Sequence, residues 1–152
     1  SLVDEQVIDA LYRASNAGVE VEILVRGMCA LRPGVPGLSE NIKVRSVLGR
    51  YLEHSRAFTF NGGGDPAVYI GSADMMHRNL DRRVEALVRL VQPDHIREIN
   101  DLFDLCMSDE VASWRLDSHG KWERHQFGLG GVRLTDAQDQ IMKDVHAKRN
   151  AR

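Results

Sequence analysis

The chain has 152 residues, a net charge of −2 and two cysteines. This length is enough for one domain with its own buried core, and two cysteines are too few for a secreted disulfide scaffold. No apolar run approaches the roughly 18 residues of a membrane span, and no charged-then-apolar leader opens the sequence. We therefore expect one domain over residues 1–152, belonging to a longer chain, with Cys29 and Cys106 as reduced thiols in the cytoplasm.

The basic residues are distributed unevenly. Residues 26–56 contain six arginines and lysines against two acids, and residues 78–89 contain four arginines against two acids. The two segments carry +6 together, so the rest of the chain carries −8. Such a distribution favours an anionic ligand bound at one place over general adhesion to nucleic acid. A solvated surface with uneven charge is the alternative interpretation.

The first elements predict an α/β fold. Asp4 precedes apolar residues at helical spacing, which predicts an amphipathic helix that stops at Gly18. In residues 19–25, every second residue is Val or Ile, and the residues between them are Glu20, Glu22 and Leu24. This period of two predicts a strand that ends at Arg26. In α/β sheets, ligands tend to lie beyond the carboxyl ends of strands, where Arg26 would stand.

The loop over residues 27–41 is unusually long and contains two prolines. Loops of this length inside compact domains are more often functional than not, and we expect Arg32 and the glycine backbone to face an anion. The alternative is a proline-stiffened surface excursion. Residues 42–48 are compatible with a short strand or one helical turn.

A β-hairpin is predicted next. The β-favouring residues 57–60 run into a turn over residues 62–66, and residues 68–70 form the returning strand. This hairpin places His54 and Arg56 at its entry and Gly71 and Ser72 at its exit. If the entry is a strand, His54 and Arg56 share a face, because side chains alternate with period two.

The second half of the sequence predicts a strand over residues 84–88, a helix from Pro93 and a second hairpin with its turn at residues 117–120. Residues 128–131 are expected to be a flexible link. Thr135 and Gln138 have the spacing of a capping box, which predicts a final helix to about residue 148.

His54 and Arg56 suit phosphate chemistry. A neutral imidazole can act as a nucleophile or as a general acid or base near pH 7, and arginine binds phosphate with a planar fork that stays charged. The sequence has no Walker loop, dinucleotide fingerprint or nucleophile elbow. We give no role to the other histidines, which show no metal-ligand spacing: His77, His95, His119, His125 and His146.

Five motifs carry a resemblance to a known family: residues 24–27 (LVRG), 31–41 (LRPGVPGLSEN), 51–56 (YLEHSR), 71–74 (GSAD) and 78–83 (RNLDRR). They resemble the last domain of bacterial polyphosphate kinases. These enzymes form two families, and the resemblance is to the first. The likeness is strong over residues 1–90 and weaker beyond them. It implies an α/β phospholipase-D-like fold, a mixed sheet flanked by helices.

The resemblance also implies an activity. Enzymes of that family transfer the terminal phosphate of ATP reversibly to polyphosphate through a phosphohistidine, with Mg²⁺ accompanying ATP. The phosphohistidine belongs to a preceding domain that this sequence lacks, so the isolated domain is expected to be inactive. His54 matches a second motif histidine that contacts nucleotide phosphates or serves as acid or base. Arg26 and Arg83 match phosphate-binding arginines, and Arg56 keeps the charge of the lysine in the general phospholipase-D motif. No metal ligand is expected here.

The implied partners are ATP or ADP, polyphosphate, the preceding domains of the same chain and further copies in a homo-oligomer. Nucleic acid and a transmembrane segment are not expected, and the implied location is the cytoplasm, including the membrane periphery. Two alternatives remain open. One is a phospholipase-D-like phosphodiesterase that pairs His54 across a dimer, and the other is a non-catalytic polyphosphate-binding module.

Overall fold

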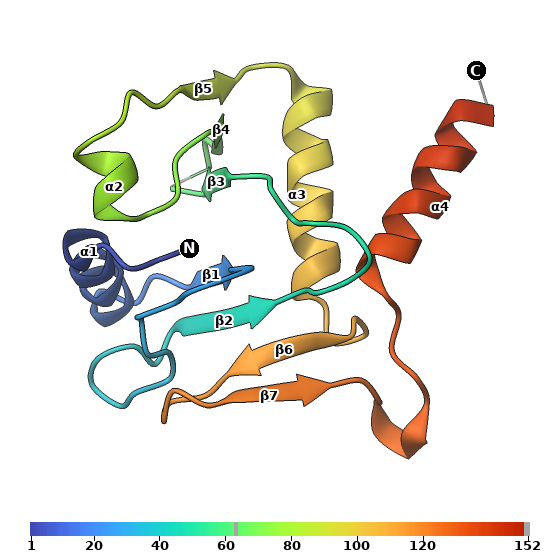
Figure 1. Ribbon diagram of the computed structural model, residues 1–152, viewed down its shortest axis with the longest axis horizontal. Helices are drawn as coiled ribbons and strands as arrows, with labels where there is room; N and C mark the ends of the chain where they lie inside the picture. The colour runs from blue at the N-terminus through green and yellow to red at the C-terminus, as the bar shows by residue number, and fades with distance from the viewer. Residues whose placement is uncertain (63, 151–152) are drawn as a thin grey trace.

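A computed structural model describes residues 1–62 and 64–150 (Figure 1). The strands form a four-stranded sheet in the order β1-β2-β6-β7 and a three-stranded sheet in the order β3-β4-β5. The elements are α1 (Glu5–Asn16), β1 (Val21–Leu24), β2 (Ile42–Ser46), β3 (Ala57–Phe60), β4 (Ala67–Gly71), α2 (His77–Leu80), β5 (Leu87–Leu90), α3 (Pro93–Met107), β6 (Ser113–Leu116), β7 (Trp122–His125), η1 (Leu129–Gly131) and α4 (Ala137–Asn150).

The four-stranded sheet is mixed. Strands β1 and β2 are parallel, with Val21 opposite Ile42, whereas β6 is antiparallel to β2 and to β7. Residues 42–48, for which the sequence allowed a strand or a turn, contain strand β2. Its apolar face and α1 share one core, and each buried side chain of this size contributes about 1.5–3 kcal/mol. The core comprises Leu2, Ile8, Val25, Leu31, Ile42 and Val44.

Helix α1 begins and ends as the sequence predicts. The Asp4 carboxylate accepts a hydrogen bond from the Val7 N–H at 3.0 Å, which satisfies a donor that the helix leaves free. Gly18 follows the helix with φ of 85°, a left-handed conformation that glycine adopts without strain. The amphipathic helix is therefore confirmed at both ends.

The predicted β-hairpin is also confirmed. Strands β3 and β4 pair antiparallel, and the Gly71 N–H donates to the Arg56 carbonyl at 2.9 Å, so the two ends of the hairpin meet. The turn predicted at residues 62–66 includes Gly63, which lies outside the described residues. The third strand starts later than the predicted residues 84–88, because its pairing with β4 begins where Leu87 lies opposite Gly71.

The loop over residues 27–41 is held by internal bonds. The buried Ser39 hydroxyl donates to the Arg32 carbonyl at 2.6 Å and accepts from the Val35 N–H at 3.0 Å. The Arg32 guanidinium donates to the Ser118 carbonyl at 2.6 Å. Arg32 therefore ties the loop to the β6–β7 turn, and an anion facing Arg32 stays a prediction.

Helix α4 stands at one side of the molecule, beyond α3 (Figure 1). The predicted capping box is wrong in detail. Asp136 supplies the cap, since its carboxylate accepts from the N–H groups of Gln138 and Asp139 at 2.9 and 3.1 Å. Thr135 instead pairs through its backbone with Glu110 and Ala112. The helix and the second hairpin lie where the sequence predicts them, and residues 128–131 contain the short helix η1.

No helix in the described part of the chain is both long enough and apolar enough to cross a membrane.

Candidate phosphate-binding site

His54 and Arg56 contact each other, although not for the reason that the sequence suggested. Residues 52–56 are not in a strand, so the two side chains do not share a strand face. Arg56 instead turns back along the chain. Its Nη1 lies 2.9 Å from Nδ1 of His54 and 3.0 Å from the His54 carbonyl oxygen. The two residues therefore form a pair within the connection between β2 and β3.

The contact with Arg56 holds the ring of His54 in place. Nη1 of Arg56 lies 2.9 Å from Nδ1 and 3.4 Å from Nε2, so the guanidinium lies against the face of the imidazole. His54 is exposed, so its ring nitrogens can reach a ligand. A neutral imidazole can then donate or accept one hydrogen bond at each nitrogen, according to its tautomer.

Asp74 holds the other side of Arg56. Its two oxygens lie 3.3 and 3.1 Å from Nε and Nη2 of Arg56. Burial by itself would raise the pKa of Asp74, but the hydrogen bonds and the charge of Arg56 hold that pKa below its usual value. Asp74 is therefore ionised at neutral pH, compensates the charge of Arg56 and fixes its orientation.

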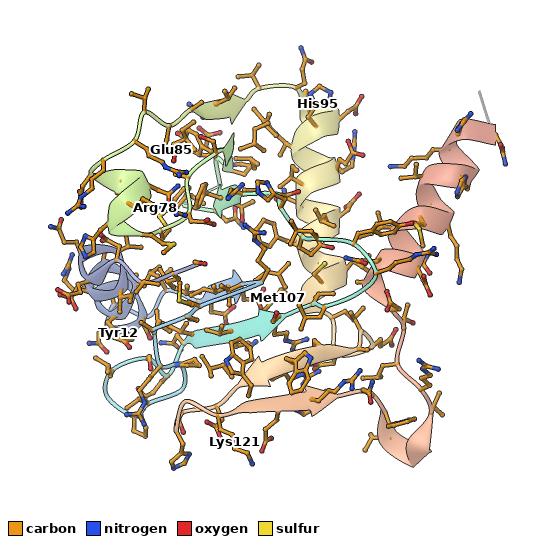
Figure 2. The ribbon with its side chains drawn as sticks, viewed as in Figure 1. Tyr12, Arg78, Glu85, His95, Met107 and Lys121 are labelled. Carbon is orange, nitrogen blue, oxygen red and sulfur yellow. The ribbon has the colours of Figure 1, made fainter. Side chains whose placement is uncertain are left out.

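A second carboxylate lies between α2 and the β3–β4 hairpin, where Figure 2 labels Glu85. Glu85 accepts hydrogen bonds from the Ser72 hydroxyl and, at 2.7 Å, from the Asn79 amide. These two hydrogen bonds lower the pKa of Glu85, and the charges of Arg83 and Arg56 lower it further. The 71–74 and 78–83 motifs are thus joined around one ionised carboxylate.

Asp74 and Glu85 are site residues to which the sequence reasoning gave no role. Both stand in or beside the quoted motifs, so a signal was present. An acid close to a basic motif in sequence could, however, equally be a solvated surface charge. Only the hydrogen bonds to Arg56 and Ser72 assign these two carboxylates to the site.

The structure does not join the other two predicted residues to His54 by direct contact. Arg26 stands beyond the end of β1 and is half-buried, whereas Arg83 is exposed after α2. Within the described residues, neither guanidinium has a hydrogen bond or an ion pair. Arg83 reaches the site only through its charge acting on Glu85. A phosphate-binding role for both arginines stays a prediction.

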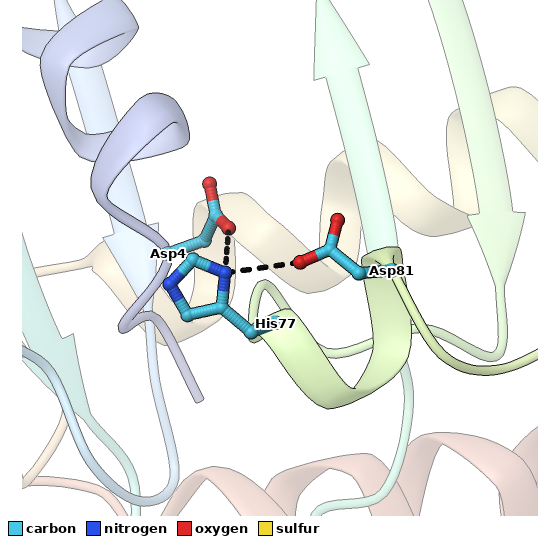
Figure 3. Close-up of side chains that lie close together, drawn as sticks. All are labelled: Asp4, His77 and Asp81. Carbon is cyan, nitrogen blue, oxygen red and sulfur yellow. Dashed lines mark hydrogen bonds and ion pairs between the residues drawn. The ribbon is translucent and has the colours of Figure 1, made fainter.

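One cluster in the described residues has the donor atoms that a metal ion could use. Nδ1 of His77 lies 3.2 Å from Oδ2 of Asp4 and 3.1 Å from Oδ2 of Asp81 (Figure 3). The other oxygen of Asp4 caps α1. A single proton on Nδ1 of His77 would be shared between the two carboxylates, and the cluster links α1 to α2.

Mg²⁺ is implied by the family resemblance as a companion of ATP. Mg²⁺ takes oxygen ligands in near-octahedral geometry and binds through one or two carboxylates with substrate phosphates. The oxygens of Asp74 and Glu85 each accept a hydrogen bond and keep a further lone pair. A role for Mg²⁺ stays a prediction, and we derive no step through it.

Comparison with solved structures places this geometry in a known fold. The crystal structure of polyphosphate kinase from Porphyromonas gingivalis superposes with a TM-score of 0.89 and 38% sequence identity, over 99% of this chain and 23% of that one. The fold is therefore the mixed α/β, phospholipase-D-like fold that the sequence resemblance implied.

The sequence comparisons identify the family. Residues 1–131 match the family model described as polyphosphate kinase C-terminal domain 2, and the chain belongs to this family. The polyphosphate kinase of Streptomyces coelicolor is 59% identical over all 152 residues, and polyphosphate kinase 1 of Chlorobaculum tepidum is 52% identical over 122 residues, or 80% of this chain. The chain spans about a fifth of the length of these relatives, 20% and 18% respectively.

Proposed function

We propose that this domain supplies the nucleotide- and polyphosphate-binding half of a polyphosphate kinase, whose phosphorylated histidine lies in a preceding domain. The complete protein would transfer the terminal phosphate of ATP reversibly to polyphosphate. The observation that carries the proposal is the arrangement of an exposed His54 beside Arg56, which lies 2.9 Å from Nδ1 of His54 and is held from its other side by Asp74. It supports an imidazole and a guanidinium that are positioned together for a phosphate.

In this scheme, the bond between the γ-phosphorus and the β,γ-bridging oxygen of ATP breaks, and a bond forms from that phosphorus to the histidine of the preceding domain. The electron pair leaves with ADP. A ring N–H of His54 donates to a phosphate oxygen as charge develops on it. Phosphoryl transfer needs mainly positioning and charge neutralisation, which Arg26 and Arg83 would supply. In the second step, the terminal oxygen of polyphosphate displaces the histidine.

The test is the replacement His54→Ala in the complete protein that carries this domain, with the exposed His119→Ala as matched control. We expect His54→Ala to lower kcat for polyphosphate synthesis by about 10²–10⁴, the usual contribution of a positioned acid or base. ATP affinity should change much less. Lower affinity with an unchanged kcat would instead favour the non-catalytic binding module. Synthesis at a comparable rate by residues 1–152 alone would contradict the need for a preceding domain.

The proposal includes ATP or ADP and polyphosphate as ligands, Mg²⁺ arriving with ATP, and a cytoplasmic homo-oligomer as the complete assembly. Size-exclusion chromatography with light scattering on the complete protein would test the last of these.

A further inference from the structure

The segment that carries His54 is attached to the C-terminal helix by one buried side chain. Between β2 and β3 the chain reaches across to the base of α4 and returns (Figure 1). This connection has no helix or strand over residues 47–56, and Tyr51 and Leu52 are exposed. Its position must therefore be fixed by side-chain contacts rather than by a backbone ladder.

The Gln138 amide makes that contact. Its Oε1 accepts from the Tyr51 N–H at 2.8 Å, and its Nε2 donates to the Tyr51 carbonyl at 2.8 Å. The second hydrogen of Nε2 goes to the carboxylate of Glu53, at 2.5 Å. The side chain thus pairs with a backbone as a neighbouring strand would, and it also holds the residue directly before His54.

The clamp formed by Gln138 is built on a rigid base. Gln138 is 5% exposed, and the adjacent Ala137 is fully buried in a core with Val47, Cys106 and Val111. The Asp136 cap fixes the first turn of α4. Beyond residue 142 the helix is exposed, and there an ion pair of 3.8 Å joins Lys148 to Glu98 on α3, so the buried contacts of α4 come from its first turns.

Gly49 shows how closely the segment fits around the amide. A Cβ at this position would clash with Oε1 of Gln138 and lie 2.6 Å from its Cδ. Since Gln138 is buried and bonded three times, it cannot move aside without losing those bonds. A residue without a side chain is therefore required where the segment passes over the amide.

We infer that Gln138 is a positioning residue, which sets the place of the His54 imidazole by fixing the backbone at Tyr51 and the side chain of Glu53. Arg56 and Asp74 hold the ring from one side, and Gln138 holds the segment from the other. Gln138 lies outside residues 1–131, the part of the chain that the family model matches. The consequence for catalysis rests on the proposed function, whereas the clamp itself does not.

The experiment compares Gln138→Leu and Gln138→Glu with the half-buried Gln140→Ala in the complete protein. Hydrogen exchange in peptides covering residues 47–56 measures the clamp directly. We expect faster exchange in both Gln138 variants and a kcat for polyphosphate synthesis reduced roughly tenfold to a hundredfold, the effect of a small misplacement of a reacting group. Gln140→Ala should resemble wild type in both measurements, and circular dichroism establishes that each variant is folded.

Gln138→Glu adds a readout that a merely structural role would not give. An ionised carboxylate at position 138 would face the Tyr51 carbonyl and the Glu53 carboxylate without a donor, whereas its protonated form regains one O–H. The ratio of the Gln138→Glu rate to the wild-type rate should therefore rise as the pH falls from about 8 to about 6.

Two results would overturn the inference: unchanged exchange over residues 47–56, or unchanged kcat despite faster exchange. If the wild-type protein showed no phosphoryl transfer, the proposed function would fail, and the exchange data alone would decide whether the clamp exists.

Discussion

Replacing Asp74 by asparagine removes the charge that compensates Arg56 while keeping nearly the same shape. The Asp74 side chain is 12% exposed, and this burial by itself would raise its pKa. In the 152-residue chain, Arg56 together with the free amino group at Ser1 lowers the pKa from 3.8 to about 2. A lowered carboxyl pKa means that the folded state binds the proton less tightly than the unfolded state. The resulting stabilisation is complete above about pH 4 and disappears as the pH falls through about 2.

The gap between a pKa of 3.8 and one of about 2 corresponds to about 2 kcal/mol of unfolding free energy. The difference in stability between wild type and Asp74→Asn should therefore shrink by about 2 kcal/mol between about pH 7 and about pH 2, measured by urea denaturation of this chain. The matched control is Asp94→Asn, which removes an 88% exposed carboxylate paired only with Arg97 on the same helix. The reasoning would be refuted if the difference in unfolding free energy between wild type and Asp74→Asn did not change with pH. That result would mean that the pKa of Asp74 is the same in the folded and unfolded states.

Two further predictions concern the arginine beyond β1 and the buried thiol. Arg26→Ala should weaken the binding of ATP and polyphosphate to the complete protein by about 1.5–3 kcal/mol, the size of a charge-assisted hydrogen bond. Titration calorimetry measures these affinities, and unchanged affinities would remove Arg26 from the site. Burial raises the pKa of the Cys106 thiol to about 11, so only about one molecule in a thousand carries the thiolate at pH 8. Since the thiolate is the reactive form, iodoacetamide should modify Cys106 far more slowly than a free cysteine. Modification of Cys106 at the rate of free cysteine would show that the core around this thiol opens readily in solution.

Local patterns in the sequence determined much of the fold. Asp4 and Gly18 start and stop α1 because caps act on the nearest backbone groups, and the β3–β4 hairpin follows from two β-favouring runs around a glycine turn. These interactions join residues that are close in sequence, so they can be predicted from the sequence alone. The family could be predicted for a related reason, because its motifs are continuous runs of residues.

The orientation of the site was decided only by the tertiary structure. Arg56 meets Asp74 across 18 positions of the sequence, and Gln138 meets Tyr51 across 87. Nothing in the local pattern distinguishes Gln138 from a capping-box residue or Asp74 from a surface acid. Their roles arise because a folded chain must pair every buried polar group, and the available partners are set by packing rather than by spacing. The sequence therefore determined which groups are present, and the packing of α4 and the hairpin decided how His54 is held.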